Sequence, residues 1–115
     1  MTDDEPEVDA TFTAVERATS MAVGMLGVKG SLRADGSLEI GYGFGRESWG
    51  RGLATEAVTA LSAHLLARSE VRAIFAETAV WNRASERVLE KAGFVRFGVD
   101  WDEEDGDLVV WRVLA

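Results

Sequence analysis

Residues 38–55 read LEIGYGFGRESWGRGLAT, and two periodicities meet in this stretch. Up to position 45, apolar side chains at every second residue alternate with Glu39 and three glycines. That alternation predicts a strand with one apolar face and one face of nearly bare backbone, against which something lies close. From 52 to 67 apolar residues recur every three or four positions, which predicts a helix with a buried stripe.

Further elements are predicted on both sides of this strand–loop–helix unit. Strands are expected at 11–17 and 21–30, and Asp35-Gly36 is typical of a tight hairpin turn. A strand at 71–80 follows the helix directly, so the crossover should make it parallel to 38–44. A second helix is predicted at 83–92, with Asn82 as N-cap and Gly93 as left-handed C-terminal residue. Residues 94–102 and 107–114 form a predicted closing hairpin.

Together these elements predict an α/β (α+β) domain with a mixed, largely antiparallel, twisted sheet and two main helices. The length of 115 residues suits one domain with one core. We expect it to occupy 11–115, after a disordered acidic tail at 1–10 that contains the only proline.

Composition limits the classes of function. Cysteine is absent and there is one histidine, which argues against disulfides, cysteine nucleophiles and thiolate or histidine-clustered metal sites. No apolar run is long enough for a membrane span and no signal layout opens the chain, so we expect a cytoplasmic protein that binds no membrane. The net charge of -8 argues against a nucleic-acid partner.

The negative charge is unevenly distributed. Residues 3–9 hold five acids and residues 100–107 hold six, whereas residues 10–99 carry nine acids against eleven Lys and Arg, a balance of +2. The outlying acids keep a small domain soluble or attract a cationic amine.

The loop from Gly43 to Thr55 is rich in small residues and contains two arginines. Glycines let backbone wrap closely around a ligand, and free N–H groups at a helix start attract anions. The loop is thus a candidate phosphate cradle, with a plain structural turn as the alternative. It matches neither the dinucleotide fingerprint nor the nucleotide-triphosphate loop.

A second motif lies downstream, where residues 82–94 read NRASERVLEKAGF. With the segment WGRGLATEA at 49–57, it makes residues 21–99 resemble the acetyl-CoA-binding half of the GNAT superfamily of N-acyltransferases. The branch it is most similar to acetylates the N-termini of ribosomal proteins. Trp49 stands where the family's loop usually has Gln or Arg.

The resemblance implies acetyl-CoA as co-substrate and a set of residues that bind it. Backbone N–H groups of 50–55 would bind the pyrophosphate, the end of the preceding strand would pair with the pantetheine arm, and arginines would meet the outer phosphates. The candidate cofactor-binding residues are Phe44, Gly45, Arg46, Gly50, Arg51, Gly52, Leu53, Ala54, Thr55, Asn82, Ser85 and Arg87.

The resemblance also frames the candidate catalytic residues. Glu39 is the candidate general base, because it projects from the same strand face as two glycines and many relatives have a glutamate at the matching position; a purely structural Glu39 is the alternative. In many relatives a tyrosine acts as the general acid that protonates the leaving thiolate, and this chain has Leu89 at that position. Ser85, or less directly Tyr42, would then assist the departing thiolate, which needs little help near a thiol pKa of ~8.5. Glu77 and Thr78 would shape the acceptor pocket.

The chain departs from the family in length. The family's first strand and the helices that wall the acceptor site have no counterpart in this sequence, so we expect an uncovered sheet edge and apolar face. We therefore predict a homodimer or another partner that covers this region.

The sequence thus predicts an acetyl-CoA-dependent N-acetyltransferase that acts on a primary amine, either a protein N-terminus or a small amine. The alternative is a non-catalytic acyl-CoA-binding or regulatory module derived from such an enzyme.

Overall fold

The computed structural model describes residues 11–15, 22–45 and 52–115. Its elements follow the order β1 (Thr11–Val15), β2 (Ala22–Lys29), β3 (Ser37–Phe44), α1 (Leu53–Leu66), β4 (Ala73–Ala79), α2 (Arg83–Lys91), β5 (Val95–Asp102) and β6 (Gly106–Leu114). Each lies within about two residues of its predicted range. The expected acidic tail at 1–10 lies outside the described residues.

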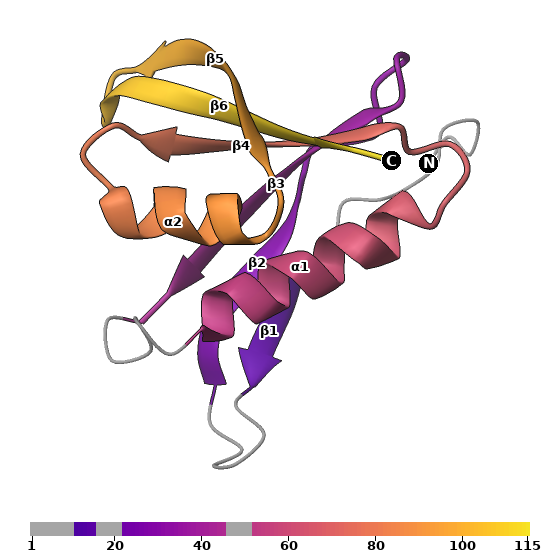
Figure 1. The fold of residues 1–115 in the computed structure, drawn as a ribbon, viewed down its shortest axis with the longest axis horizontal. Helices are drawn as coiled ribbons and strands as arrows, with labels where there is room; N and C mark the ends of the chain where they lie inside the picture. The colour runs from indigo at the N-terminus through magenta and orange to yellow at the C-terminus, as the bar shows by residue number, and fades with distance from the viewer. Residues whose placement is uncertain (1–10, 16–21, 46–51) are drawn as a thin grey trace.

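The strands form one sheet in the order β1-β2-β3-β4-β6-β5 (Figure 1). β3 and β4 are parallel, and the other four neighbouring pairs are antiparallel. The predicted mixed, largely antiparallel sheet with two helices is confirmed. The closing hairpin places β6 beside β4, so that β5 becomes an edge of the sheet.

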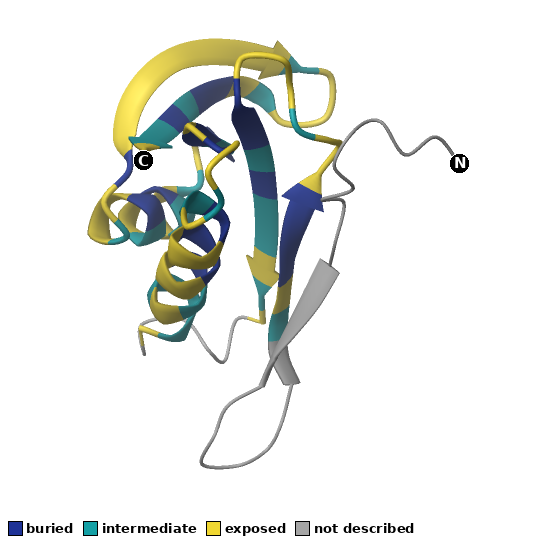
Figure 2. Ribbon diagram, turned by 90° about the vertical axis from the view of Figure 1, so that its right-hand side faces the viewer, coloured by how far each residue is buried: buried dark blue, intermediate teal, exposed yellow. Residues whose placement is uncertain are grey.

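Both helices pack on the same face of the sheet (Figure 2). Between helices and sheet lies one cluster of buried apolar residues, in which Leu38, Val58, Ile74 and Leu89 have no exposed surface. The side chains of the even-numbered residues of β3 and β4 point into this core. Those of the odd-numbered residues, such as Glu39, Phe75 and Glu77, lie on the opposite face of the sheet, here called the outer face. Among the described residues no helix is long and apolar enough to cross a membrane.

Local sequence explains the ends of the elements. Gly36 adopts φ 85° in the β2–β3 turn, where the Asp35 carboxylate accepts from the Ser37 N–H at 3.0 Å and its hydroxyl at 2.7 Å. Asn82 caps α2 through its side chain, which accepts from the Ser85 N–H at 3.1 Å. Gly93 ends that helix at φ 93°. The predicted N-cap at Asn82 and the predicted left-handed conformation of Gly93 are confirmed.

β3 and β4 pair along only a short part of their lengths. Their register runs from Ser37 opposite Ala73 to Glu39 opposite Phe75, and beyond it both strands continue without pairing to each other. β4 remains held on its other side, where it pairs with β6 as far as Ala79. The parting of β3 from β4 leaves an open strand edge on each side of a wedge (Figure 1).

Candidate functional site

A groove of about 360 Å³ lies where the end of β3, the start of α1 and one side of α2 meet. It brings together two sequence motifs that are some thirty residues apart. Its lining residues are Tyr42, Gly43, Phe44, Gly52, Ala54, Thr55, Asn82, Ala84, Ser85, Arg87, Val88 and Lys91.

Most of the candidate cofactor-binding residues line this groove. Phe44, Gly52, Ala54, Thr55, Asn82, Ser85 and Arg87 are among the lining residues, whereas Gly45 and Leu53 are described but do not line it. Arg46, Gly50 and Arg51 lie outside the described residues.

The start of α1 presents backbone donors to the groove. Gly52 adopts φ 77° at the N-cap position, a conformation that side-chain-bearing residues rarely adopt. Its carbonyl accepts from the Glu56 N–H at 3.0 Å, so the N–H groups of the first turn before Glu56 have no partner within the helix. Such an end carries partial positive charge and suits an anion.

α2 supplies positive side chains to the same groove. Arg87 and Lys91 are four residues apart, so they share one side of the helix with Ala84 and Val88. Lys91 was not among the residues predicted from sequence. Its four-residue spacing from Arg87 is the signal that could have found it, because side chains four residues apart share one face of a helix.

Tyr42 joins β3 to α2 at the groove. Its hydroxyl lies 3.0 Å from the Ser85 carbonyl oxygen and 2.8 Å from Ser85 Oγ. Burial raises the pKa of Tyr42 to about 12, and the hydrogen bond to Ser85 opposes that rise. The phenol therefore stays protonated at neutral pH.

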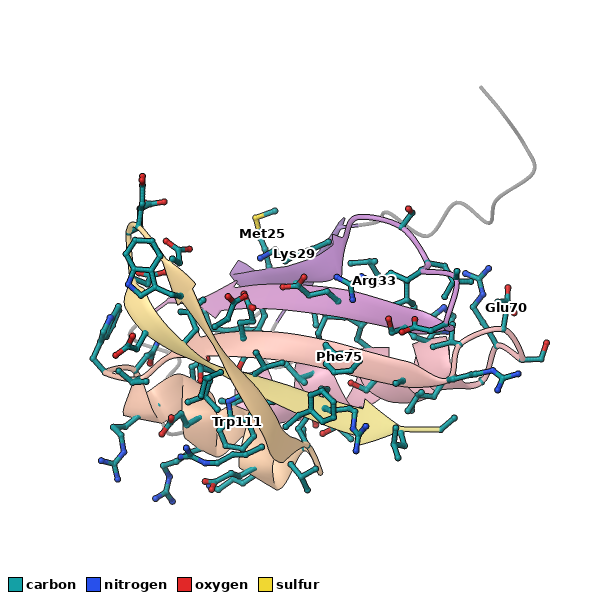
Figure 3. The ribbon with its side chains drawn as sticks, turned by 90° about the horizontal axis from the view of Figure 1, so that it is seen from above. Met25, Lys29, Arg33, Glu70, Phe75 and Trp111 are labelled. Atoms are coloured by element: carbon teal, nitrogen blue, oxygen red, sulfur yellow. The ribbon has the colours of Figure 1, made fainter. Side chains whose placement is uncertain are left out.

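The outer face carries carboxylates beside the wedge. Glu39 lies 3.6 Å from Lys29 Nζ and 3.4 Å from an Arg33 guanidinium nitrogen, and about a fifth of its side chain is exposed. Lys29 and Met25 extend on the side of the sheet away from the helices (Figure 3). Glu39 is thus at the predicted position on the glycine face, but it is already engaged by two cations.

Glu77, on β4, has a different environment from Glu39. Its pKa is raised, and burial is the largest cause. A hydrogen bond with the Asp100 carboxyl and the negative charges of Glu39 and Asp100 raise the pKa further, whereas the positive charge of Lys29 lowers it. A carboxyl with a raised pKa is a better proton acceptor near neutral pH than a fully solvated one. The sequence placed Glu77 and Thr78 near the acceptor pocket and did not single out Glu77 as a base. Thr78 is instead buried on the core side of β4, where it accepts a hydrogen bond from Trp111.

The bare backbone predicted for β3 is on the outer face. Gly41 pairs with Gly27 and Gly43 pairs with Met25. These four residues line an open depression of about 230 Å³. A methyl group built on Gly43 would meet no atom within 4 Å. No neighbour among the described residues therefore requires glycine at 43, which leaves room for an external group to lie against this backbone.

The position at which the family resemblance implies a tyrosine is buried here. Leu89 has no exposed surface and packs in the core between helices and sheet. Among the described residues of α2, Ser85 is the hydroxyl that faces the groove.

The family model for the acetyltransferase (GNAT) domain matches residues 1–95. The chain therefore belongs to the GNAT acetyltransferase family.

Individual proteins are similar to this chain in sequence or in fold. The uncharacterized N-acetyltransferase p20 of Bacillus licheniformis is 29% identical over 100 residues, which cover 85% of this chain and 56% of that protein. The ribosomal-protein-S5-alanine acetyltransferase of Vibrio fischeri has a similar fold, with a TM-score of 0.83, 19% identity, and coverage of 93% of this chain and 62% of that one.

A third relative is a structure of AAC(6')-Ib in complex with ribostamycin and coenzyme A. Its TM-score is 0.77 at 25% identity, with coverage of 90% of this chain and 63% of that one. The chain thus spans less than two thirds of the length of each of these three relatives.

Proposed function

We propose that this chain is an acetyl-CoA-dependent N-acetyltransferase that moves the acetyl group to a primary amine. The observation that carries the proposal is the groove. In it the N-terminus of α1, which has Gly52 as its N-cap, meets Arg87 and Lys91 of α2 and the edge of β3 that is not paired with β4. These are the features that a long, phosphorylated thioester with two amide groups requires. Family membership and a relative's complex with coenzyme A support the same reading.

The phosphates would bind at the helix ends. The N–H groups that follow Gly52, with those of Gly50 and Arg51, would hold the pyrophosphate, and Arg46, Arg87 and Lys91 would add charge. Leu53, Ala54 and Thr55 complete this first turn. The pantetheine arm would run along the β3 edge at Phe44 and Gly45, where β4 no longer pairs with it, and reach Asn82 and Ser85.

The transfer itself exchanges one bond for another. The amine nitrogen attacks the thioester carbonyl carbon, a C–N bond forms, the C–S bond breaks, and coenzyme A leaves as a thiolate. Backbone N–H groups of β3 would stabilise the carbonyl oxygen while it is anionic. The nitrogen loses its proton to a carboxylate, and the thiolate takes up a proton with little help because the thiol pKa of ~8.5 lies above neutral pH.

Two glutamates are candidates for the base. Glu39 is the residue that the sequence singles out, and its ion pairs with Lys29 and Arg33 suit a charged structural role as well. Glu77 has the raised pKa that a general base for the amine requires. We propose Glu77 as the stronger candidate, because burial, the Asp100 carboxyl and the negative charge of Glu39 all raise its pKa.

The experiment is coenzyme A binding by calorimetry, followed by release of free thiol from acetyl-CoA with peptides, polyamines and aminoglycosides as acceptors. Binding with turnover supports the enzyme, and the absence of binding refutes the proposal. Glu77→Gln should lower kcat/KM by roughly 10²–10⁴-fold and remove the rise of rate with pH through the carboxyl pKa. Glu39→Gln should lower it less, and Glu70→Gln, at an exposed ion pair, should leave it unchanged.

The second candidate is a non-catalytic acyl-CoA-binding module. Leu89 favours it, because this buried residue replaces the tyrosine expected on α2. Coenzyme A binding without thiol release for any amine would identify this alternative.

Assembly and location are also proposed. Val95, Phe97, Val99 and Trp101 of the edge strand β5 are all more than half exposed, which favours a partner such as a second copy of the chain. A homodimer should double the mass in sedimentation, and a monomer at tens of micromolar would refute it. A cytoplasmic location remains our proposal from the composition.

A further inference from the structure

A pair of hydrogen bonds between Tyr42 and Ser85 connects β3 to α2 at the groove, and the proposed chemistry does not use it. Tyr42 comes from β3 and Ser85 from the first turn of α2, 43 residues later, and both line the groove. The two contacts, at 3.0 Å to the Ser85 carbonyl oxygen and 2.8 Å to Ser85 Oγ, are partly buried. A paired contact of this kind between two walls of a binding site fixes the distance between them.

The proton positions in this contact follow from counting donors. A tyrosine hydroxyl has one proton, and a carbonyl oxygen can only accept. The Tyr42 hydroxyl therefore donates to the Ser85 carbonyl, and Ser85 Oγ donates to Tyr42 Oη. The Ser85 hydroxyl proton is then committed, and the lone pairs on Ser85 Oγ remain available as acceptors.

The Ser85 backbone is held from a second direction. Its N–H donates to the Asn82 side chain at 3.1 Å, in the N-cap of α2. Asn82 Oδ1 and Tyr42 Oη therefore hold one residue through its N–H, its carbonyl and its hydroxyl. This leaves Ser85 Oγ little freedom to turn toward another acceptor.

The location of the contact gives it a mechanical role. β3 pairs with β4 only as far as Glu39, so Tyr42 lies on the part of β3 that has left β4. On its other side this part still pairs with β2, where Tyr42 lies opposite Leu26. Tyr42 thus ties the part of β3 that is not paired with β4 to α2, in the wall of the groove where the pantetheine arm would run.

We propose that Tyr42 is a positioning residue of the acyl-CoA groove, which sets the spacing of β3 and α2 and orients Ser85 Oγ to accept a hydrogen bond from a pantetheine amide N–H. This inference rests on the proposed function. It assigns Ser85 the role of an acceptor for the ligand in place of a proton donor to the thiolate. Tyr42 acts through Ser85 and takes no part in the bond-making step.

The alternative role for Tyr42 as acid to the thiolate fits the site less well. Its proton is already donated to a carbonyl, and its raised pKa makes proton release to a thiolate unfavourable. A thiol pKa of ~8.5 lies above neutral pH, so the released thiolate equilibrates to the thiol in solvent without a dedicated acid.

The test is a double-mutant cycle on coenzyme A affinity, with Tyr42→Phe, Ser85→Ala and the pair, measured by calorimetry at low temperature after circular dichroism has shown each variant folded. Each single variant should bind coenzyme A roughly 5- to 10-fold more weakly. The double variant should be no weaker than about the worse single one, because both changes disrupt one arrangement. The separate variant Ser85→Thr keeps the hydroxyl, so its affinity for coenzyme A should stay within about 2-fold of that of the wild type.

Three outcomes overturn the inference while leaving the proposed function intact: Tyr42→Phe binding as tightly as wild type, losses that multiply in the double variant, or Ser85→Thr binding as weakly as Ser85→Ala. If Tyr42→Phe fails to fold, the comparison of Ser85→Ala with Ser85→Thr decides the matter, since equal affinities refute the role of the hydroxyl. Wild type that binds no coenzyme A refutes the proposed function itself, and with it this inference.

Discussion

Replacing Thr78 by Val removes one oxygen from the centre of the sheet and leaves a buried donor without its partner. Trp111 is 1% exposed, and its Nε1–H donates to Thr78 Oγ1 at 2.9 Å. Thr78 is 3% exposed, so water does not replace the lost acceptor. Valine matches threonine in shape, which confines the change to the hydrogen bond.

The expected cost follows from the asymmetry between making and breaking such a bond. An unsatisfied buried donor costs about 1–3 kcal/mol, more than the net value of the intact bond. For a domain of this size, ~4 °C in Tm corresponds to each kcal/mol. We therefore expect Thr78→Val to lower Tm by roughly 4–12 °C.

Thermal unfolding followed by far-ultraviolet circular dichroism measures this fall in Tm without relying on tryptophan emission. Thr78→Ser is the matched control, because it keeps the hydroxyl and loses one methyl group, at about 0.8 kcal/mol. Thr78→Val combined with Trp111→Phe should cost less than the sum of the two single changes, since no donor is then left unpaired. Thr78→Val as stable as Thr78→Ser would refute the reasoning.

Two further changes test the turn and the groove. The Ser37 hydroxyl and N–H hold the pKa of Asp35 below its usual range. These hydrogen bonds stabilise the folded state at pH values above the carboxyl pKa of the unfolded chain, and the stabilisation is lost as the pH falls through the pKa of the folded state. The urea midpoint of wild type should thus exceed that of Asp35→Asn at pH 7 and approach it at pH 3, whereas an equal difference at both pH values would contradict the assignment. Arg87→Gln and Lys91→Gln should each weaken coenzyme A binding by roughly 3- to 10-fold at low salt, and by less at 0.5 M salt, because screening removes the attraction of exposed charges. Arg68→Gln, at the other end of α1, should have no effect, and a loss of affinity that does not depend on salt would remove the electrostatic role.

Local patterns predicted most of the secondary structure. The alternation in β3, the three-to-four spacing in α1 and the capping residues of α2 all act within a few residues, so a single stretch of chain contains the whole signal. The parallel pairing of β3 and β4 also followed from the chain order, because a helix connects them. The placement of β6 between β4 and β5 did not, since a hairpin can add to a sheet through either of its strands.

The candidate site was predicted in part. The residues at the start of α1 and along α2 were identified by their motifs, and most of them do line one groove. Lys91 and the contact between Tyr42 and Ser85 were missed, because each depends on where a helix lies against a strand. The environment of Glu77 likewise depends on Asp100, which reaches it from another strand.

The sequence by itself determined the order and type of the elements, the glycines of the loop and the membership of the GNAT family. These depend on nearest neighbours and on motifs that are contiguous in the chain. Only the tertiary structure decided how far β3 stays with β4, which cations share the groove, and which glutamate lies partly buried beside other carboxylates. Those properties depend on distances between residues far apart in the chain, and on the burial that only the assembled sheet and helices create.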